Sequence, residues 1–350
     1  MSGMPGERVH RLRHSLEVAA PAGAVFALLA DTARRPLYSP HVVHVERLDF
    51  DGVRERLRVW ESAGGRIRSS LLVRVQHPHE RRIEFVQLGG ESPVDSMNGE
   101  WTVEEGANGR SVVTVRHEFT VAGGRDDDAA GEGLVTGDNA RAELESLRRI
   151  AESRAGLDDL VLSFEESVRV NGPGELLYDF LYRAADWPGL LPHMRHLKLT
   201  EPSPGVQILD YDVRLPDGAV HPGASVRLCF PHAGRIVFKQ TVPSGPVAAH
   251  TGEWSVLPDE YGVRVIAQHT VLLDESALLL DGAAPWAALR ASERSGAGPV
   301  SPSVLELARR RVRQAIGRTS LAILELAGQH AESSVRSLPR RSAATAGSLP

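Results

Sequence analysis

Alternating apolar and polar residues near the start of the chain predict a β-strand over residues 9–18 (VHRLRHSLEV). A short apolar helix is expected next, with Pro21 at its first turn, where proline is favoured because no hydrogen bond from its nitrogen is needed. Several strand-like segments separated by glycine-rich turns follow. Residues 138–153 then predict a helix with one apolar face.

The same order of elements occurs a second time. Residues 160–170 predict a strand, a helix is expected after Pro173, and residues 303–330 predict another long closing helix. The Gly/Asp-rich segment 122–137 and the Gly/Ser/Pro-rich segment 275–302 are expected to be long loops before the two closing helices. This order is typical of an α+β domain.

An internal repeat explains the recurrence. The sequence VRVQHPHERRIEFVQ at 73–87 returns as VRLCFPHAGRIVFKQ at 226–240, an offset of 153 residues, and NGEWTV at 98–103 returns as TGEWSV at 251–256 with the same offset. A repeat of this length is far too long for a solenoid. It predicts two homologous domains in tandem and a tail: residues 8–155, 158–331 and, disordered, 332–350.

Composition excludes several classes of function. The net charge of −5 argues against nucleic acid as the main partner, because phosphate-binding domains are normally basic. No apolar run approaches the length of a membrane span, and the polar N-terminus lacks the apolar stretch of a signal peptide. The single cysteine, Cys229, excludes a disulfide framework. We therefore expect a cytoplasmic protein that binds neither membrane nor nucleic acid.

Short motifs, most of them present in both copies, carry a resemblance to a known family. They are V-R-V-x-x-P-H-x-x-R-I at 73–83, G-E-W at 99–101 and 252–254, V-R-H-E-F at 115–119, R-A-E-L-x-x-L at 141–147 with R-T-S-L-x-x-L at 318–324, and W-P-x-L-x-P at 187–192. Their order and duplication resemble the di-domain aromatase/cyclases of bacterial type II polyketide synthases. The resemblance covers about residues 10–330.

The resemblance implies a fold and an activity. The fold is α+β, with two tandem helix-grip (START-like) domains, each a curved antiparallel sheet wrapped around its long C-terminal helix and enclosing a cavity. The activity is regiospecific aldol cyclisation of a poly-β-ketone bound to an acyl carrier protein, followed by dehydration to the first aromatic ring. The di-domain type is associated with closure between the seventh and twelfth carbons. Partners would be the minimal polyketide synthase components, and the chain would be a monomer (a pseudo-dimer) or a weak homodimer.

This chemistry needs a group that moves protons and a donor that stabilises an oxyanion, and it requires no metal or redox cofactor. His117 is the best candidate for proton transfer, because alternation puts it on an apolar, inward strand face with Val115. His269 has the same setting in the second copy. The alternative is a pair of core histidines inherited with the fold.

Arg74 and Arg227 align with the arginine that the family uses to hold polyketide oxygens and to stabilise the enolate. Alternation allows two orientations for Arg74. If the flanking valines face the core, the arginine faces solvent; otherwise Ser70, Leu72 and Arg74 all line the cavity. The resemblance favours the inward orientation.

Glu143 lies beside the apolar face of the first closing helix, where its carboxylate could face the cavity and pair with Arg74 or His117. A solvent-facing glutamate is the alternative. The second copy has Ser320 at this place, and this asymmetry assigns cyclisation to the N-terminal domain.

Four aromatic residues are candidates for the walls that shape the substrate: Tyr38, Trp101, Trp187 and Trp254. The two tryptophans of the G-E-W motifs are equally compatible with plain core positions. The first copy departs from the family at Arg35, which stands where the second has Trp187. His41 and His44 form an H-x-x-H pair, but no cysteine or acidic residue lies nearby at ligand spacing, so zinc is not expected.

Three functional hypotheses follow. The first is the aromatase/cyclase; the second is a non-catalytic lipid or polyketide binder, because helix-grip cavities also serve only to carry ligands. In the third, the second copy is a structural partner that braces the first.

Overall fold

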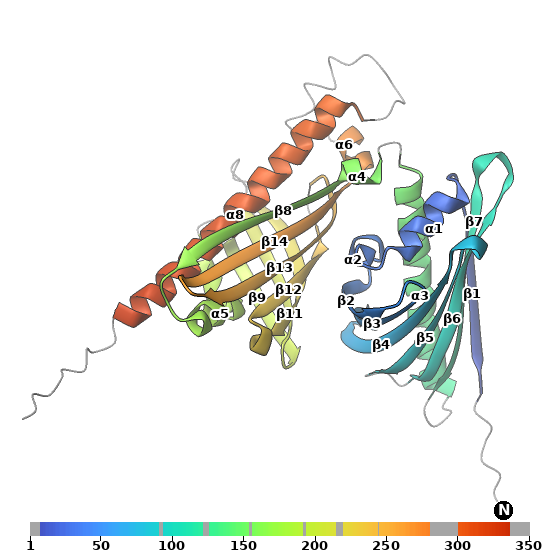
Figure 1. Ribbon diagram of the computed structural model, residues 1–350, viewed down its shortest axis with the longest axis horizontal. Coiled ribbons are helices and arrows are strands. Elements are labelled where there is room, and N and C mark those ends of the chain that lie inside the picture. Colours follow the sequence, from blue (N-terminus) through green and yellow to red (C-terminus); the bar gives the residue numbers. More distant parts are fainter. Residues whose placement is uncertain are drawn as a thin grey trace, which may run out of the picture.

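The first half of the chain forms one seven-stranded antiparallel sheet in the strand order β1-β7-β6-β5-β4-β3-β2 (Figure 1). Its strands are β1 (His10–Val18), β2 (Val42–Phe50), β3 (Arg54–Ala63), β4 (Arg66–His77), β5 (Arg82–Gly90), β6 (Val94–Glu105) and β7 (Ser111–Val121). Its helices are α1 (Ala22–Ala30), α2 (Arg35–Tyr38) and α3 (Asp126–Ala151). The computed structural model describes residues 8–90, 94–121, 126–153, 156–191, 194–214, 220–243, 245–280 and 300–336.

The second half repeats this topology, with the strand order β8-β14-β13-β12-β11-β10-β9. Its strands are β8 (Val161–Val170), β9 (Met194–Ser203), β10 (Val206–Arg214), β11 (Val220–Phe230), β12 (Arg235–Val242), β13 (Val247–Asp259) and β14 (Gly262–Leu273). Its helices are α4 (Leu157–Leu160), α5 (Gly174–Tyr182), α6 (Glu275–Leu280) and α8 (Pro302–Arg336). The predicted fold of two sheets, each with a long C-terminal helix, is confirmed; the sheets stay open. The predicted domain limits 8–155 and 158–331 stay a prediction.

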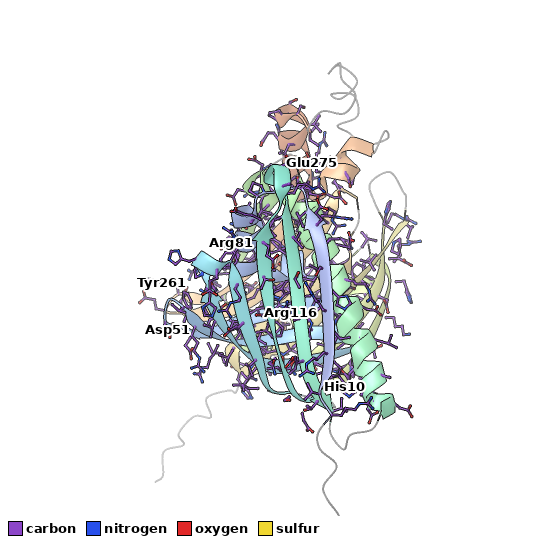
Figure 2. All side chains as sticks on the ribbon, turned by 90° about the vertical axis from the view of Figure 1, so that its right-hand side faces the viewer. His10, Asp51, Arg81, Arg116, Tyr261 and Glu275 are labelled. Carbon is purple, nitrogen blue, oxygen red and sulfur yellow. The ribbon has the colours of Figure 1, made fainter. Side chains whose placement is uncertain are left out.

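Each long helix packs its apolar stripe on the concave face of its sheet. In the first domain Leu144 and Leu147 of α3 are buried in one cluster with Val113 and Val115 of β7. The opposite face of this sheet is charged: Arg116 points outward in Figure 2 and pairs with Glu100 on the neighbouring strand at 2.7 Å. The sheet therefore has the apolar inner face that the alternation of β7 predicts.

The predicted loop over 122–137 is wrong for residues 126–137, which form the first turns of α3. Glycine and aspartate are weak helix formers, so this start depends on tertiary contacts. Ala129 packs in a cluster with Phe119, and Glu132 forms an ion pair with Arg68 of β4 at 2.8 Å. Residues 122–125 lie outside the described part of the chain.

The other two segments that we expected to be irregular are also partly helical. Helix α6 occupies the start of the expected loop 275–302, and residues 281–299 are outside the description. Helix α8 continues to Arg336, into the segment 332–350 that we expected to be disordered, and residues 337–350 are not described. None of the described helices has the length and apolar run needed to cross a bilayer.

The two domains pack through different surfaces. The outer face of the second sheet, with Val226, Leu228 and Val237, buries Val43 and Trp60 of the first domain in one apolar cluster. This explains why β11 and β12 are apolar on both faces, since a strand covered on both sides needs no polar face. The outer face of the first sheet is covered by this contact at Trp60 of β3, but it is exposed on β5: Val86, which aligns with Lys239 of the second copy, is 45% exposed.

Candidate active site

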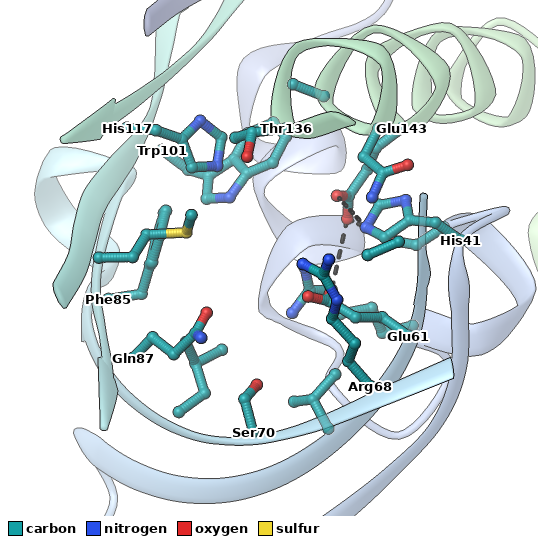
Figure 3. Close-up of a pocket in the computed structure, with 18 of the residues that line it drawn as sticks. His41, Glu61, Arg68, Ser70, Phe85, Gln87, Trp101, His117, Thr136 and Glu143 are labelled. Carbon is teal, nitrogen blue, oxygen red and sulfur yellow. Dashed lines mark hydrogen bonds and ion pairs between the residues drawn. The ribbon is translucent and has the colours of Figure 1, made fainter. Parts of the chain in front are cut away.

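The first domain encloses a cavity of about 110 Å³ between its sheet and α3 (Figure 3). All seven residues predicted for this domain line it: Tyr38, Ser70, Leu72, Arg74, Trp101, His117 and Glu143. Three strands, α2 and α3 supply them. The inward orientation of Ser70, Leu72 and Arg74 on β4 is therefore the one that the structure adopts.

Glu143 of α3 is buried in the cavity wall, but its partners are neither Arg74 nor His117. The Ser39 hydroxyl donates a hydrogen bond to its carboxylate, and Arg35 Nε donates another at 3.3 Å. His41 Nε2 lies 3.7 Å from Glu143 Oε2. Figure 3 shows Glu143 and His41 together on one side of the cavity, with His117 and Trp101 across from them.

The charges within this cluster are set by burial and by the neighbours. Burial raises the pKa of Glu143, but the positive charge of Arg35, the His41 ring and the hydrogen bonds from Ser39 and Arg35 outweigh it and hold the pKa at about 2. Burial lowers the pKa of His41 to about 4, although the Glu143 charge opposes this shift. At neutral pH the pair is therefore a carboxylate beside a neutral imidazole.

His41 has one ring nitrogen turned to Glu143 and the other available. Its Nδ1 is buried and has no hydrogen-bond partner among the described residues. When Nε2 carries the proton toward the carboxylate, Nδ1 has the free lone pair of a base. A carboxylate behind an imidazole also stabilises the imidazolium that forms when the base takes a proton.

His117 of β7 forms the opposite wall. Its ring packs edge-on against Phe85 with a centroid distance of 5.4 Å, and burial lowers its pKa to about 4. Within the described part of the chain, its buried Nδ1 has no hydrogen-bond partner either. The predicted inward position of His117 is confirmed, and the ring is a neutral proton acceptor or donor at neutral pH.

Arg74 lines the cavity, and its guanidinium group is hydrogen-bonded and ion-paired to other residues of the first domain. Its Nη1 donates to Thr32 Oγ1 at 2.6 Å and lies 3.0 Å from Glu55 Oε1, while Nη2 donates to the Leu29 carbonyl at 2.6 Å. Glu55 is its cross-strand partner on β3 and is fully buried. These bonds tie β4 to the end of α1, so Arg74 contributes a fixed positive charge and an anchor.

Glu61 of β3 is a further acidic group in the cavity wall that sequence reasoning missed. Burial raises its pKa, the Arg35 charge opposes this, and the Glu143 charge adds to it. A carboxyl group with a raised pKa keeps its proton more readily and so suits the role of a proton donor.

The second domain has its own cavity of about 270 Å³, and all four residues predicted for it line it: Trp187, Arg227, Trp254 and His269. The guanidinium of Arg227 lies 5.3 Å from the ring centres of both tryptophans. Its cross-strand partner is Gln207, in place of the Glu55 of the first domain. Arg227 Nη2 donates to the Leu181 carbonyl, but Nε and Nη1 are buried without a partner among the described residues.

His269 lies in a buried hydrogen-bond chain in this second cavity. His250 Nε2 is 3.1 Å from His269 Nδ1, and His269 Nε2 is 2.9 Å from the Ser320 hydroxyl. Ser320 thus occupies the place of Glu143, as the sequence predicts, and brings no charge.

Arg35, Ser39 and His41 are the main residues that sequence reasoning missed. Their common partner, Glu143, is far away in the chain, and only the fold brings them together. A signal was present, however: the first copy has Arg35, Ser39 and Glu143 where the second has Trp187, Leu191 and Ser320. Three polar residues that are replaced together point to a shared site.

Comparison with known proteins extends this picture. A family described as polyketide cyclase / dehydrase and lipid transport matches residues 9–152. The granaticin polyketide synthase bifunctional cyclase/dehydratase of Streptomyces violaceoruber is 33% identical over 333 residues, covering 94% of this chain and 96% of the relative. The actinorhodin polyketide synthase bifunctional cyclase/dehydratase of Streptomyces coelicolor is 34% identical over 282 residues, covering 77% of this chain and 85% of the relative.

Solved structures with both domains are also similar. The di-domain ARO/CYC BexL from the BE-7585A biosynthetic pathway is 34% identical with a TM-score of 0.71, covering 92% of this chain and 99% of that protein. The di-domain ARO/CYC StfQ from the steffimycin biosynthetic pathway is 28% identical with a TM-score of 0.71, covering 93% and 99%. The similarity thus extends over both domains.

Proposed function

The chain belongs to the family of bifunctional polyketide cyclase/dehydratases, and from this premise we propose that its N-terminal cavity catalyses the aldol cyclisation and dehydration of a poly-β-ketone. The observation that carries the proposal is the Glu143–His41 pair, an ionised carboxylate beside a neutral imidazole: His41 lines the cavity, and its buried Nδ1 has no hydrogen-bond partner among the described residues. In this buried cavity His41 is a base whose protonated, positively charged form is stabilised by the Glu143 carboxylate.

In the first step His41 Nδ1 takes a proton from a methylene group between two carbonyls, and Glu143 stabilises the imidazolium. The resulting enolate carbon attacks a ketone carbon further along the chain, a carbon–carbon bond forms, and the ketone oxygen becomes an alkoxide. The positive charges of Arg35 and Arg74 favour both anions, since a fixed cation in a buried cavity interacts strongly with developing negative charge. The proton on His41 then returns to the alkoxide.

The dehydration step uses other residues that line the same cavity. A base removes the proton from the carbon next to the new alcohol, and the hydroxyl group leaves as water when an acid protonates it. His117 and Glu61 suit these two roles, because one is a neutral imidazole and the other a carboxyl group with a raised pKa. Tyr38 and Trp101 bound the space in which the chain must fold.

The substrate is proposed to be bound to an acyl carrier protein of a type II polyketide synthase, with ring closure between the seventh and twelfth carbons. The resemblance to the di-domain aromatase/cyclases and the names of the relatives support this assignment. The cytoplasm is the proposed place of action, and the unpaired thiol of Cys229 fits a reducing compartment.

The residues that line the second cavity suit ligand binding better than catalysis. Binding without catalysis is the role of START-like proteins that carry ligands. It has no counterpart of the Glu143 carboxylate, and the unpartnered donors of Arg227 between two tryptophans suit a ligand with carbonyl oxygens and an apolar chain. We propose that this cavity holds polyketide chain or intermediate without cyclising it.

Reconstitution with a minimal polyketide synthase tests the catalytic proposal. Glu143→Gln and His117→Phe are compared with the wild-type protein by the ratio of correctly cyclised product to spontaneous shunt products. We expect that ratio to fall by roughly a hundredfold for each variant. If both variants keep the wild-type ratio and rate, the cavity acts only as a binder.

A further inference from the structure

Lys239 of the second domain reaches into the first domain. It lies on β12 with its neighbours Phe238 and Gln240 turned to the second cavity, so its own side chain leaves the opposite, outer face of the sheet. There it is 4% exposed, buried against the segment that joins α2 to β2. A lysine this deeply buried needs partners for its three N–H groups.

Three backbone carbonyls of the first domain supply those partners. Lys239 Nζ donates to the carbonyl oxygens of Ser39 at 2.8 Å, Pro40 at 3.0 Å and Val42 at 2.6 Å. The ammonium group has three donors, and the three bonds use all of them. The segment from Ser39 to Val42, which we call the α2–β2 loop, is thus held by one cation from the other domain.

This loop carries two of the groups that surround Glu143. The Ser39 hydroxyl donates to the carboxylate, and His41 lies between two of the carbonyl groups that Lys239 holds. The first domain fixes the loop with the bonds Val42 N to Ser39 O at 3.1 Å and Ser62 N to His41 O at 2.8 Å. Burial lowers the pKa of Lys239 to about 7, and the Glu143 charge opposes this shift, so the two charges interact across the domain boundary.

We infer that Lys239 is a positioning residue for the cyclisation site: the second domain uses it to hold the α2–β2 loop so that His41 and Ser39 stay aligned on Glu143. The first copy has Val86 at the aligned position, exposed on its own outer sheet face, so the contact is made in one direction only. The second domain therefore completes the site of the first. This inference rests on the proposed function of that site.

A double-mutant cycle tests the inference. Lys239→Met keeps the length of the side chain and removes its donors. We expect it to lower the rate of correct cyclisation by roughly tenfold to a hundredfold, because small displacements of catalytic groups are costly. In the Glu143→Gln background the same change should cost less than about twofold, since the aligned pair is already lost. An equal loss in both backgrounds would overturn the inference.

Two further variants keep the test decisive. Arg235→Met is the matched control, because Arg235 lies on the same strand and pairs with Glu46 of the first domain at 3.2 Å without touching the α2–β2 loop; it should leave the rate within about twofold. If Lys239→Met does not fold, Lys239→Gln, which retains two donors, takes its place in the cycle with the same criteria.

A spectroscopic measurement separates this inference from the proposed function. NMR signals of the His41 imidazole, assigned with His41→Asn, should shift in Lys239→Met and stay unchanged in Arg235→Met. Unchanged His41 signals in Lys239→Met would refute the positioning role. If the wild-type protein forms no cyclised product at all, the proposed function fails, and these signals still decide the role of Lys239.

Discussion

Glu143 and His41 form a buried carboxylate–imidazole pair, with 3.7 Å between Oε2 and Nε2, although they come from α3 and from the α2–β2 loop. Glu143→Gln keeps the shape of this pair and removes its charge. Since the Glu143 charge raises the pKa of His41, the variant should lower that pKa further and leave a weaker base. We expect cyclisation to slow by about a hundredfold or more, measured as single-turnover rate.

The control for this prediction is Glu145→Gln on the same helix. Glu145 is exposed, and its ion pair among the described residues is with Arg148, three residues along α3. It should change neither the rate nor the His41 signals. A rate for Glu143→Gln equal to that of this control would remove Glu143 from the mechanism.

Stability should fall steeply in mild acid. Burial lowers the pKa of His41, His117 and His269 to about 4 and that of His250 to about 3, from an ordinary value of 6.5. Between pH 6.5 and 4 the unfolded chain therefore binds protons that the folded chain does not, and stability is lost as the pH falls through this window. Each histidine contributes up to about 1.4 kcal/mol per pH unit.

Melting temperatures from pH 8 to pH 4 measure this dependence. His117→Phe and His269→Phe each remove one of the groups and should flatten the curve in that window. Glu143 adds a loss in the same direction below pH 4.5, because its pKa is about 2 in the folded protein. A melting temperature that is constant from pH 7 to pH 5 would contradict the prediction.

Substitutions of Arg74 and Arg227 should differ in the size of their effect on folding stability. Arg74→Met leaves the buried carboxylate of Glu55 with Arg47, at 3.2 Å, as its remaining cation and removes the bond to the Leu29 carbonyl, so we expect a loss of about 2 kcal/mol of unfolding free energy. Arg227 has no carboxylate within ion-pair distance in the described part of the chain, and burial lowers its pKa to about 10. Arg227→Met should be nearly neutral, because the loss of the Leu181 bond and of the two tryptophan contacts is offset by the removal of a buried charge that has no carboxylate partner among the described residues.

Denaturant titrations of the two arginine variants compare the free energies directly. This comparison also affects how activity data are interpreted, since a loss of cyclisation in Arg74→Met includes the displacement of α1. Equal destabilisation of both variants would show that Arg227 has a partner of the same strength.

The aligned pair Glu143 and Ser320 separates the roles of the two cavities. Ser320→Ala removes the hydrogen bond to His269 Nε2 and should leave the cyclisation rate within about twofold, because the proposed cyclisation takes place in the first cavity. Its effect should appear in binding, as a change in affinity for a polyketide analogue measured by tryptophan fluorescence in a Trp101→Phe background, which leaves Trp187 and Trp254 as the cavity tryptophans. A loss of cyclisation equal to that of Glu143→Gln would assign chemistry to both domains.

The fold could be predicted because the sequence contains two copies of the same domain. Aligned motifs identified the tandem domains, and alternation on β7 placed His117 inward beside Val115. The start of α3 could not be predicted, since contacts of Ala129 and Glu132 with distant strands overcome the poor helix propensity of this segment.

Single candidates in the site were predictable, but their partners were not. Glu143 was expected to pair with Arg74 or His117; instead Arg74 is bonded to Glu55, and Arg35 and Ser39 surround Glu143. Spacing along the chain does not predict these contacts, because Arg74–Glu55 depends on the register of β3 and β4, and the contacts of Glu143 depend on how the α2–β2 loop is held against α3. For the same reason Lys239 could not be recognised, since its partners are backbone carbonyls of another domain.

The one-directional contact between the copies has a consequence for assembly. A contact between two different surfaces does not limit the number of units: if every copy carried both surfaces, domains of neighbouring chains would add one after another into a ring or an open filament. In the first copy the aligned position on the outer sheet face is Val86, so it has no lysine at this place to bond the loop of another molecule. A third unit could therefore not be held by the hydrogen bonds with which Lys239 holds the first.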